Sequence, residues 1–210
     1  KILQENCNLL LGHDETQQLI DKLAASAPKL VEELIPKKLS VSVLTQVLQN
    51  LLAESVSIRD LRGVLLAIAP VAEKVQDIDE LTGVARIALG RMIIQQYALH
   101  GDELAVMTLN PELEQVLHAT VRRGQGGNIP VEPELAEGLL RSVGSAAQDE
   151  MNSDRPAILV TSPTLRPWLS RILRPRIPGL SVLSYSELPE DTNLRVTTSI
   201  TVQARQSAAA

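Results

Sequence analysis

Apolar residues recur with the period of an α-helix through most of the first half of the chain. Between residues 14 and 96 they stand three or four positions apart, as in Leu61, Leu65 and Ile68. This spacing places apolar side chains along one face of a helix, and each such face must pack against other elements to leave water. The pattern predicts a small bundle of four or five short helices.

The expected helices are bounded by residues that favour helix starts and stops. Pro28 suits a first helical position, and Pro36 must end the helix that Pro28 begins. Asp77, with Glu80 three residues later, has the spacing of a capping box. We therefore expect Asp77 to cap a further helix.

The segment from residue 48 to residue 69, LQNLLAESVSIRDLRGVLLAIA, contains a second spacing of this kind. Ser57 is placed to accept the backbone N–H of Asp60, and the Asp60 carboxylate is placed to accept the N–H of Ser57. Val56 and Leu61 flank this pair as a hydrophobic staple would. The spacing predicts a helix that starts directly after Ser57 and whose entry angle is specified.

Short apolar runs replace the helical spacing after residue 101. The runs at 103–109, 157–161 and 181–185 have the length of β-strands, and each ends at polar residues. The first two are followed by a residue typical of helix N-caps and then by proline. These positions predict two strand-to-helix turns, with Asn110 and Ser162 as the caps.

Two further helices are expected near 111–122 and 133–150, separated by the glycine-rich segment RRGQGGNIP. Strands joined by helices pair in parallel, and the run LRVTTSITV can add an edge strand. The predicted fold class is mixed α and β. A small helical bundle is followed by a small α/β domain with a three- to four-stranded, mostly parallel sheet.

The predicted organisation has three parts. Residues 1–12 form the tail of an upstream subdomain, residues 13–100 a helical subdomain, and residues 101–210 an α/β C-terminal subdomain. Lys1 stands where a start methionine is absent, which indicates a beginning inside a longer protein. The three terminal alanines contribute nothing to the predicted fold.

Composition argues against several classes of protein. The chain of 210 residues is 44% apolar, enough for a packed core. No run approaches the roughly 20 apolar residues of a membrane-spanning helix. The single cysteine, Cys7, cannot form an internal disulfide, which fits a cytoplasmic protein. A net charge of −5 and only three aromatic residues argue against nucleic acid as a partner.

Candidate sites for phosphate or metal are weak. The glycines at 124, 126 and 127 follow a predicted helix and lack the Lys-Ser/Thr ending of a nucleotide-binding loop, so a flexible connection is the simpler interpretation. His13, His100 and His118 are scattered, and Cys7 with His13 has no second pair at a ligand spacing. No metal site and no cofactor are predicted.

Candidate catalytic groups are equally sparse. Ser162 lacks the Gly-x-Ser-x-Gly context of a nucleophile, and a capping role already explains it. The carboxylates near loops and helix ends fit solvated positions better than paired acid–base catalysis; they are Glu32, Glu33, Glu187, Glu190 and Asp191. The residues predict no enzyme. A small α/β nucleotide-binding enzyme on a helical adaptor remains the alternative, because of the strand-to-helix turns and the glycine loop.

The proline-rich segment LRPWLSRILRPRIPGL contains a tryptophan beside four arginines, Arg166, Arg171, Arg174 and Arg176. Tryptophan and arginine are enriched at the centres of protein interfaces, and an arginine cluster could meet an acidic partner. Trp168 and Arg171 are therefore candidate partner contacts. A core position for Trp168 is the other interpretation.

Four stretches together carry a family resemblance. They read HDETQQLIDKL, PKLVEELIPKKLSVSVLTQVLQNLLAESVSIRDLRGVLLAIA, LTGVARIALGRMIIQQ and ILVTSPTLRPWLSRILRPRIPGLSVLSYSELPEDTNLRVTTSI, and the resemblance that rests on them covers nearly the whole chain. In them the chain resembles the cytoplasmic C-terminal region of the export-gate family of type III secretion. The complete final subdomain, with VLSYSELPED, is more similar to the flagellar branch than to the injectisome branch.

The resemblance implies a bacterial inner-membrane protein whose membrane-spanning part is absent from this chain, and the last two of four cytoplasmic subdomains. In the family this region forms a homo-nonameric ring that docks export substrates and substrate–chaperone complexes and helps to order their export. It is not an enzyme, and other export-apparatus proteins, including the separate ATPase complex, are expected partners. This fragment alone is expected to be a monomer.

The resemblance also makes the segment 48–69 one of the most diagnostic parts of the chain. The polar face of the helix that follows it carries Arg59, Asp60 and Arg62. These three residues are candidate partner or subunit contacts. An injectisome export gate is the alternative that keeps this mechanism and changes the cargo.

Overall fold

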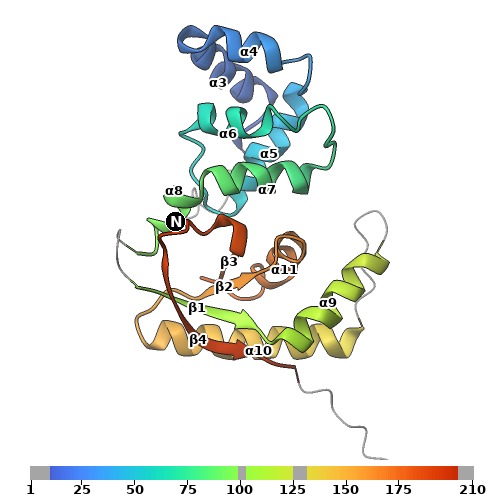
Figure 1. The fold of residues 1–210 in the computed structure, drawn as a ribbon, viewed down its shortest axis with the longest axis vertical. Coiled ribbons are helices and arrows are strands. Elements are labelled where there is room, and N and C mark those ends of the chain that lie inside the picture. Colours follow the sequence, from blue (N-terminus) through green and yellow to red (C-terminus); the bar gives the residue numbers. More distant parts are fainter. Residues whose placement is uncertain (1–9, 99–102, 125–131, 203–210) are drawn as a thin grey trace, which may run out of the picture. The chain divides into compact units, whose positions relative to one another are not determined.

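The computed structural model describes residues 10–98, 103–124 and 132–202 (Figure 1). The chain divides into two compact units, Lys1–Gln96 and Tyr97–Ala210. The division lies close to residue 101, where the sequence pattern changes. Most of the predicted upstream tail, residues 1–9, lies outside the described residues.

The first unit is helical, as its apolar spacing predicts. Its described helices are α3 (His13–Ser26), α4 (Pro28–Leu34), α5 (Val41–Ala53), α6 (Leu61–Ile68), α7 (Ile78–Ala88) and α8 (Gly90–Ile94). They outnumber the four or five expected, because one continuous apolar pattern is divided at Leu89, between α7 and α8.

Local chemistry accounts for several of the helix starts. Pro28 occupies the first position of α4. The Ser40 hydroxyl accepts the Val43 N–H at 3.2 Å at the start of α5. The Asp77 carboxylate accepts the Glu80 N–H at 2.9 Å and caps α7, at the position that the sequence assigns to a cap. Each contact satisfies an N–H group that the helix itself cannot pair.

The helices of this unit pack through their apolar stripes. α3 packs on α4 and α5, and α7 packs on α5 and α6. The buried positions include Ile20, Leu34, Leu44, Val47, Leu48, Leu51, Val64, Leu65, Ile68, Leu81 and Ala85. Two buried threonines also meet, since the Thr45 hydroxyl lies 3.0 Å from that of Thr16 and links α5 to α3. The Thr16 hydroxyl donates to the Gly12 carbonyl, and the single proton of the Thr45 hydroxyl can go to Thr16 or to the Val41 carbonyl, so neither hydroxyl is left unpaired.

The second unit is an α/β domain. It contains β1 (Glu103–Leu109), α9 (Pro111–Arg123), α10 (Pro133–Asn152), β2 (Ile158–Thr161), α11 (Arg166–Leu173), β3 (Ser181–Ser184), a 3₁₀ turn (Tyr185–Glu187) and β4 (Asn193–Ile200). All strand pairs are parallel, in the order β3-β2-β1-β4. The mixed α and β fold class predicted from the sequence is confirmed, and the expected edge strand is β4.

The sheet places its apolar side chains on both faces. Met107, Leu159 and Val182 are in register across β1, β2 and β3 and belong to one buried cluster with residues of α9, α10 and α11. The alternate positions are buried as well, as Val106 and Val160 show. Burial on both faces explains why these strands read as continuous apolar runs and not as alternating ones.

The edge strand β4 pairs with β1 from Glu103↔Asn193 to Leu109↔Ile200. The register shifts between Val106 and Met107, so β4 carries one extra residue there, Thr197. The Thr197 hydroxyl donates to the Val106 carbonyl at 3.1 Å. This bond holds the irregular point of β4 against its neighbour.

A buried carboxylate lies near this strand at the end of α10. Glu150 is 3% exposed and accepts the Arg155 Nε–H at 2.6 Å. The donation from Arg155 holds the pKa of Glu150 below its usual value, and Thr197 and Arg195 act in the same direction. Glu150 therefore stays ionised and connects the end of α10 to β4.

Candidate partner-binding surfaces

The joint before α6 differs from its prediction in one respect. The helix begins at Leu61, and its N-cap is Asp60, whose carboxylate accepts the Gly63 N–H at 2.9 Å. The Ser57 hydroxyl accepts the Arg59 N–H at 3.4 Å instead of capping a helix. The prediction of a Ser57–Asp60 capping box was wrong, because the chain enters the helix three residues later than expected.

Gly63 lies directly against the capping carboxylate of Asp60. A Cβ added at Gly63 would overlap the Asp60 carboxylate. An alanine at this position would therefore require the Asp60 carboxylate to shift from its present capping position, in which Asp60 has φ −89° and ψ 59°. An aspartate directly before the apolar helical series that begins at Leu61 is the signal in the sequence that could have placed the cap at Asp60.

A pair of helical glycines tests this dependence. Gly83, in the interior of α7, has open space where a Cβ would lie, so Gly83→Ala is expected to stabilise the helical unit by about 0.5–1 kcal/mol. Gly63→Ala is expected to show no gain, or a loss of up to about 1 kcal/mol, because it displaces the cap. Urea unfolding followed by circular dichroism measures both. In an Asp60→Ala background Gly63→Ala should become stabilising, and a stabilising effect in the unchanged background would contradict this account.

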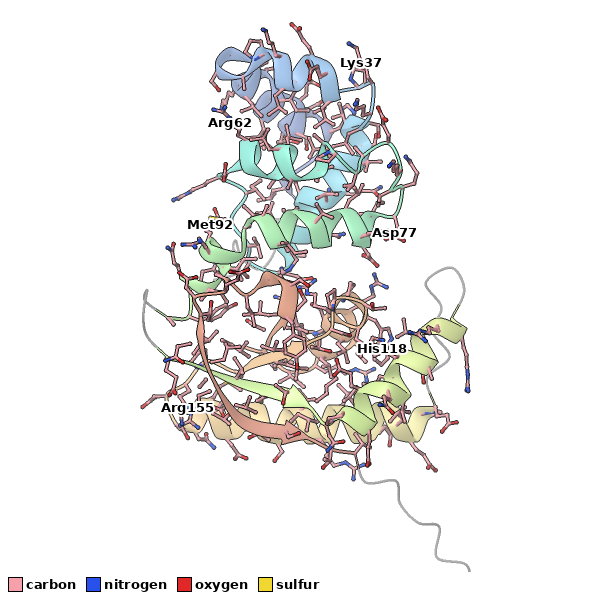
Figure 2. All side chains as sticks on the ribbon, viewed as in Figure 1. Lys37, Arg62, Asp77, Met92, His118 and Arg155 are labelled. Carbon is pink, nitrogen blue, oxygen red and sulfur yellow. The ribbon has the colours of Figure 1, made fainter. Side chains whose placement is uncertain are left out.

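The predicted contact residues of this joint are exposed. Arg59, Asp60 and Arg62 all lie at the surface, and Figure 2 marks Arg62 on α6. Leu66, one turn after Arg62, is 52% exposed, whereas the other leucines of this helix, Leu61 and Leu65, are buried. Arg59 precedes the cap and is not on the helix, contrary to the prediction. We call Arg59, together with Arg62 and Leu66 of α6, the α6 surface. Sequence reasoning missed Leu66, which lies outside the apolar series Leu61, Leu65 and Ile68 that the spacing assigns to the core face.

The tryptophan of the α/β unit belongs to the core. Trp168 is 7% exposed and lies in the buried cluster with Leu113, Val143 and Leu173. Of the two interpretations left open by the sequence, the structure supports the core position, so Trp168 presents little surface to a partner. Arg171, in the last turn of α11, is exposed.

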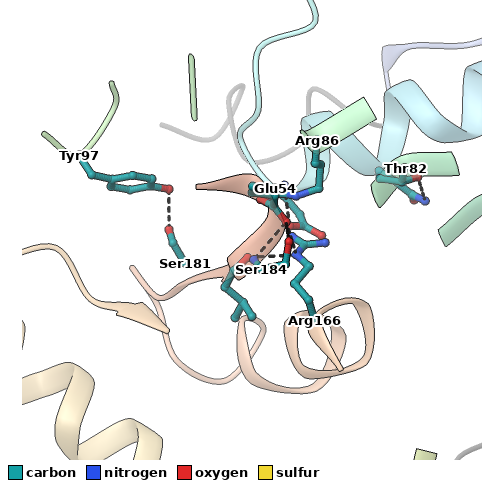
Figure 3. Close-up of polar contacts among 10 residues, drawn as sticks. Glu54, Thr82, Arg86, Tyr97, Arg166, Ser181 and Ser184 are labelled. Carbon is teal, nitrogen blue, oxygen red and sulfur yellow. Dashed lines mark hydrogen bonds and ion pairs between the residues drawn. The ribbon is translucent and has the colours of Figure 1, made fainter. Parts of the chain in front are cut away.

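The four arginines of this segment do not form one surface cluster. Arg166 is 4% exposed, its Nε donates to the Val182 carbonyl at 3.1 Å, and it lies 3.7 Å from the Glu187 carboxylate. Glu187 also accepts the N–H and hydroxyl of Ser184, which Figure 3 shows beside Arg166. Burial lowers the pKa of Arg166 to about 10, and Glu187 opposes that shift. This buried ion pair fastens α11 to β3 and corrects two expectations: a surface role for Arg166 and a solvated role for Glu187.

The prediction that Ser162 caps a helix was also wrong. α11 begins at Arg166, with Leu165 as its N-cap, and Ser162 lies before the preceding turn. The Ser162 hydroxyl is 2.9 Å from His118 Nε2 on α9, and the Ser162 N–H donates to Glu114 at 3.1 Å. Asn110, in contrast, accepts the Glu112 N–H at 2.9 Å and caps α9. The Ser162 hydroxyl, which the local pattern assigns to a helix cap, instead hydrogen-bonds to a histidine 44 residues away in the sequence.

The polar group at the carboxyl ends of the strands consists of Glu114, His118, Ser162 and Tyr185. Tyr185 follows β3 directly, and burial, with a smaller effect of the Glu114 carboxylate, raises the pKa of its hydroxyl. Parallel strands gather such side chains at one edge because their carboxyl ends meet there. Figure 2 marks His118 at this edge.

The remaining candidates from the sequence are not brought together. His13 is exposed at the start of α3, whereas Cys7, His100 and the glycines at 126 and 127 lie outside the described residues. Gly124 ends α9. Within the described ranges there is no group of three or more histidine, cysteine or acidic side chains that could hold a metal ion. In the same ranges, no helix combines the length and the apolar content needed to cross a membrane.

Comparison with curated proteins finds flagellar relatives. The chain is 41% identical over 191 residues to the flagellar biosynthesis protein FlhA of Salmonella typhimurium, covering 91% of this chain and 27% of the relative. It is 40% identical over 199 residues to FlhA of Escherichia coli, covering 95% of this chain and 28% of the relative. The chain therefore spans little more than a quarter of the length of these relatives.

Comparison with solved structures finds the same fold. The nonameric SctV-C of EPEC, solved by cryo-electron microscopy, matches with a TM-score of 0.84 and 26% identity, covering 95% of this chain and 60% of that one. The family model described as the FHIPEP family matches residues 1–193. The chain therefore belongs to the FHIPEP family, in agreement with its resemblance to the export-gate proteins of type III secretion.

Proposed function

We propose that this chain is the C-terminal cytoplasmic part of a flagellar export gate and acts as a docking platform for export substrates and substrate–chaperone complexes. The identity with the flagellar relative, 41% over 91% of the chain, carries this proposal. Identity with the structural neighbour SctV-C is lower, at 26%, and favours the flagellar over the injectisome branch. The whole protein would be anchored in the inner membrane by a part that lies outside this chain.

The proposed assembly is a homo-nonameric ring of the whole protein. Support comes from the nonameric state named for SctV-C, whose fold this chain shares. The chain covers 60% of that structure, so part of the contact surface between neighbouring subunits would be absent from it. We therefore expect this fragment alone to be a monomer, and light scattering that found a stable ring would contradict that.

The proposed role is non-catalytic, acting through protein surfaces. The pair of Ser162 and His118 has the spacing of a nucleophile and its base. The Ser162 N–H, however, donates to the Glu114 carboxylate. Acyl transfer needs such N–H groups to stabilise an oxyanion, and a neighbouring carboxylate opposes that charge. This arrangement supports a structural role for the pair over the alternative of an α/β enzyme.

Within the helical unit, the α6 surface is the proposed docking contact. It combines an exposed apolar side chain, Leu66, with the two cations Arg59 and Arg62. The exposed Asp60 carboxylate, held at the helix start by the Gly63 N–H, offsets part of the positive charge of the two arginines. Such a surface fits an apolar patch surrounded by acidic residues on a substrate or chaperone.

Charge reversal tests this contact. In the cytoplasmic region of the whole protein, Arg62→Glu and Arg59→Glu are each expected to weaken binding of a substrate–chaperone complex by about fivefold, the equivalent of about 1 kcal/mol for an exposed charge. Calorimetry at two salt concentrations measures the affinity, and the loss should shrink as salt screens the charges. The same variants in the bacterium should reduce swimming motility.

The matched control is Lys22→Glu, an equal charge change at an exposed position of α3. It should leave binding and motility unchanged. If Lys22→Glu weakens binding as much as Arg62→Glu does, the effect reflects total charge and the α6 surface is not the contact. Loss of injectisome secretion with intact motility would contradict the flagellar assignment.

A further inference from the structure

The edge strand β4 combines an unpaired backbone edge with exposed side chains on both faces. In the described part of the sheet, β4 is hydrogen-bonded to β1 on one side and to no strand on the other (Figure 1). Residues 193–196 are exposed, whereas the opposite edge strand, β3, has three buried residues and one of intermediate exposure. An open strand edge is a template for a further strand.

Two apolar side chains lie on one face of this exposed stretch. Leu194 and Val196 are 38% and 57% exposed, and they stand in register with the buried residues Leu104 and Val106 of β1. They therefore extend the apolar surface of the sheet outward past its edge. An added strand with apolar residues at alternate positions would continue this face.

The other face of the stretch carries a cation. Arg195 is half exposed and its Nε lies 2.7 Å from the Glu103 carboxylate of β1. An added strand would lie about 4.8 Å from β4 and twice as far from β1, so its side chain on this face would be closer to Arg195 than to Glu103. Opposite charges on neighbouring strands attract, and the position beside Arg195 favours an acidic residue.

We propose that the outer edge of β4, at residues 193–196, binds an extended peptide segment with the pattern apolar–acidic–apolar by strand addition. The register shift at Thr197 limits the site to these four residues. Backbone hydrogen bonds supply the affinity and the side chains of Leu194, Arg195 and Val196 supply the selectivity. The site depends on the sheet alone and is independent of the proposed export role.

The test uses the 210-residue chain and short capped peptides observed by NMR. A peptide centred on valine–glutamate–valine should shift the amides of residues 193–197 and the methyl groups of Leu194 and Val196. A peptide with lysine in place of glutamate should bind about fivefold more weakly. N-methylation of alternate residues should abolish binding in one register and spare it in the other, because successive N–H groups point to opposite sides of a strand.

Matched variants of the protein complete the test. Val196→Lys should weaken binding by about fivefold or more, since a charged side chain blocks an edge strand. Val116→Lys, at an apolar residue of α9 that is 50% exposed, should not. Equal binding of the acidic and lysine peptides, equal effects of both N-methylation registers, or shifts elsewhere would overturn the proposal. If the unchanged chain binds no peptide but forms a dimer that Val196→Lys abolishes, the strand edge binds a second copy of the chain and the proposal is wrong.

Discussion

Arg166→Ala is expected to destabilise the α/β unit by about 3–5 kcal/mol, the usual cost of breaking a buried ion pair by removing one partner. The guanidinium is 4% exposed and Glu187 is 2% exposed. Removing the cation leaves the Glu187 carboxylate buried beside Ser184 and removes the donor to the Val182 carbonyl. Urea unfolding followed by circular dichroism measures the loss.

Two control variants test whether the loss of stability comes from breaking the ion pair. Arg141→Ala, at an exposed position of α10, should change stability by no more than about 0.5 kcal/mol. The double variant Arg166→Met with Glu187→Leu should recover part of the loss, because the buried charge is removed together with its partner. A loss of less than about 1 kcal/mol for Arg166→Ala would show that the corner between α11 and β3 does not depend on the ion pair.

Trp168→Ala is expected to cost about 3–5 kcal/mol of stability, the usual range for removing a large aromatic side chain from a core. Trp168 lies in the cluster that joins α11 to α9, α10 and the sheet. The remaining cavity cannot collapse fully because three helices and the strands fix its walls. Thermal and urea unfolding provide the measurement.

Trp168→Phe is the control, since it keeps most of the buried apolar area and should cost clearly less than the alanine variant. Binding of a partner by folded Trp168→Phe should be unchanged. If Trp168→Ala leaves stability unchanged and a substrate–chaperone complex no longer binds, Trp168 is an interface residue. The assignment of Trp168 to the core would then be wrong.

The sequence predicted most elements well because their signals are local. Apolar residues at three- and four-residue spacing, or in runs of strand length, are read within one element. Asn110-Pro111 and Asp77 act on N–H groups two and three residues away, and the structure has both contacts. A side chain that finds its partner inside its own turn needs no knowledge of the rest of the fold.

The predictions that failed concern side chains with more than one available partner. Ser57 and Ser162 both have cap chemistry, but Ser57 accepts a nearer N–H and Ser162 meets His118. Arg166 was expected at the surface with its neighbours, yet it pairs with a carboxylate 21 positions later, 3.7 Å away. Composition and spacing give no means of choosing between a local partner and a distant one.

The sequence by itself determined the helical half, the parallel α/β half and the family, because these rest on periodicity, caps and long ordered matches. Only the tertiary structure decided that the last strand lies beside the first, as β4 next to β1, and not beside β3. It also decided which of several arginines is buried and which leucine of a doublet is exposed. Such choices depend on which residues distant in the sequence pack against one another. The free energy of those contacts arises only when the chain is folded.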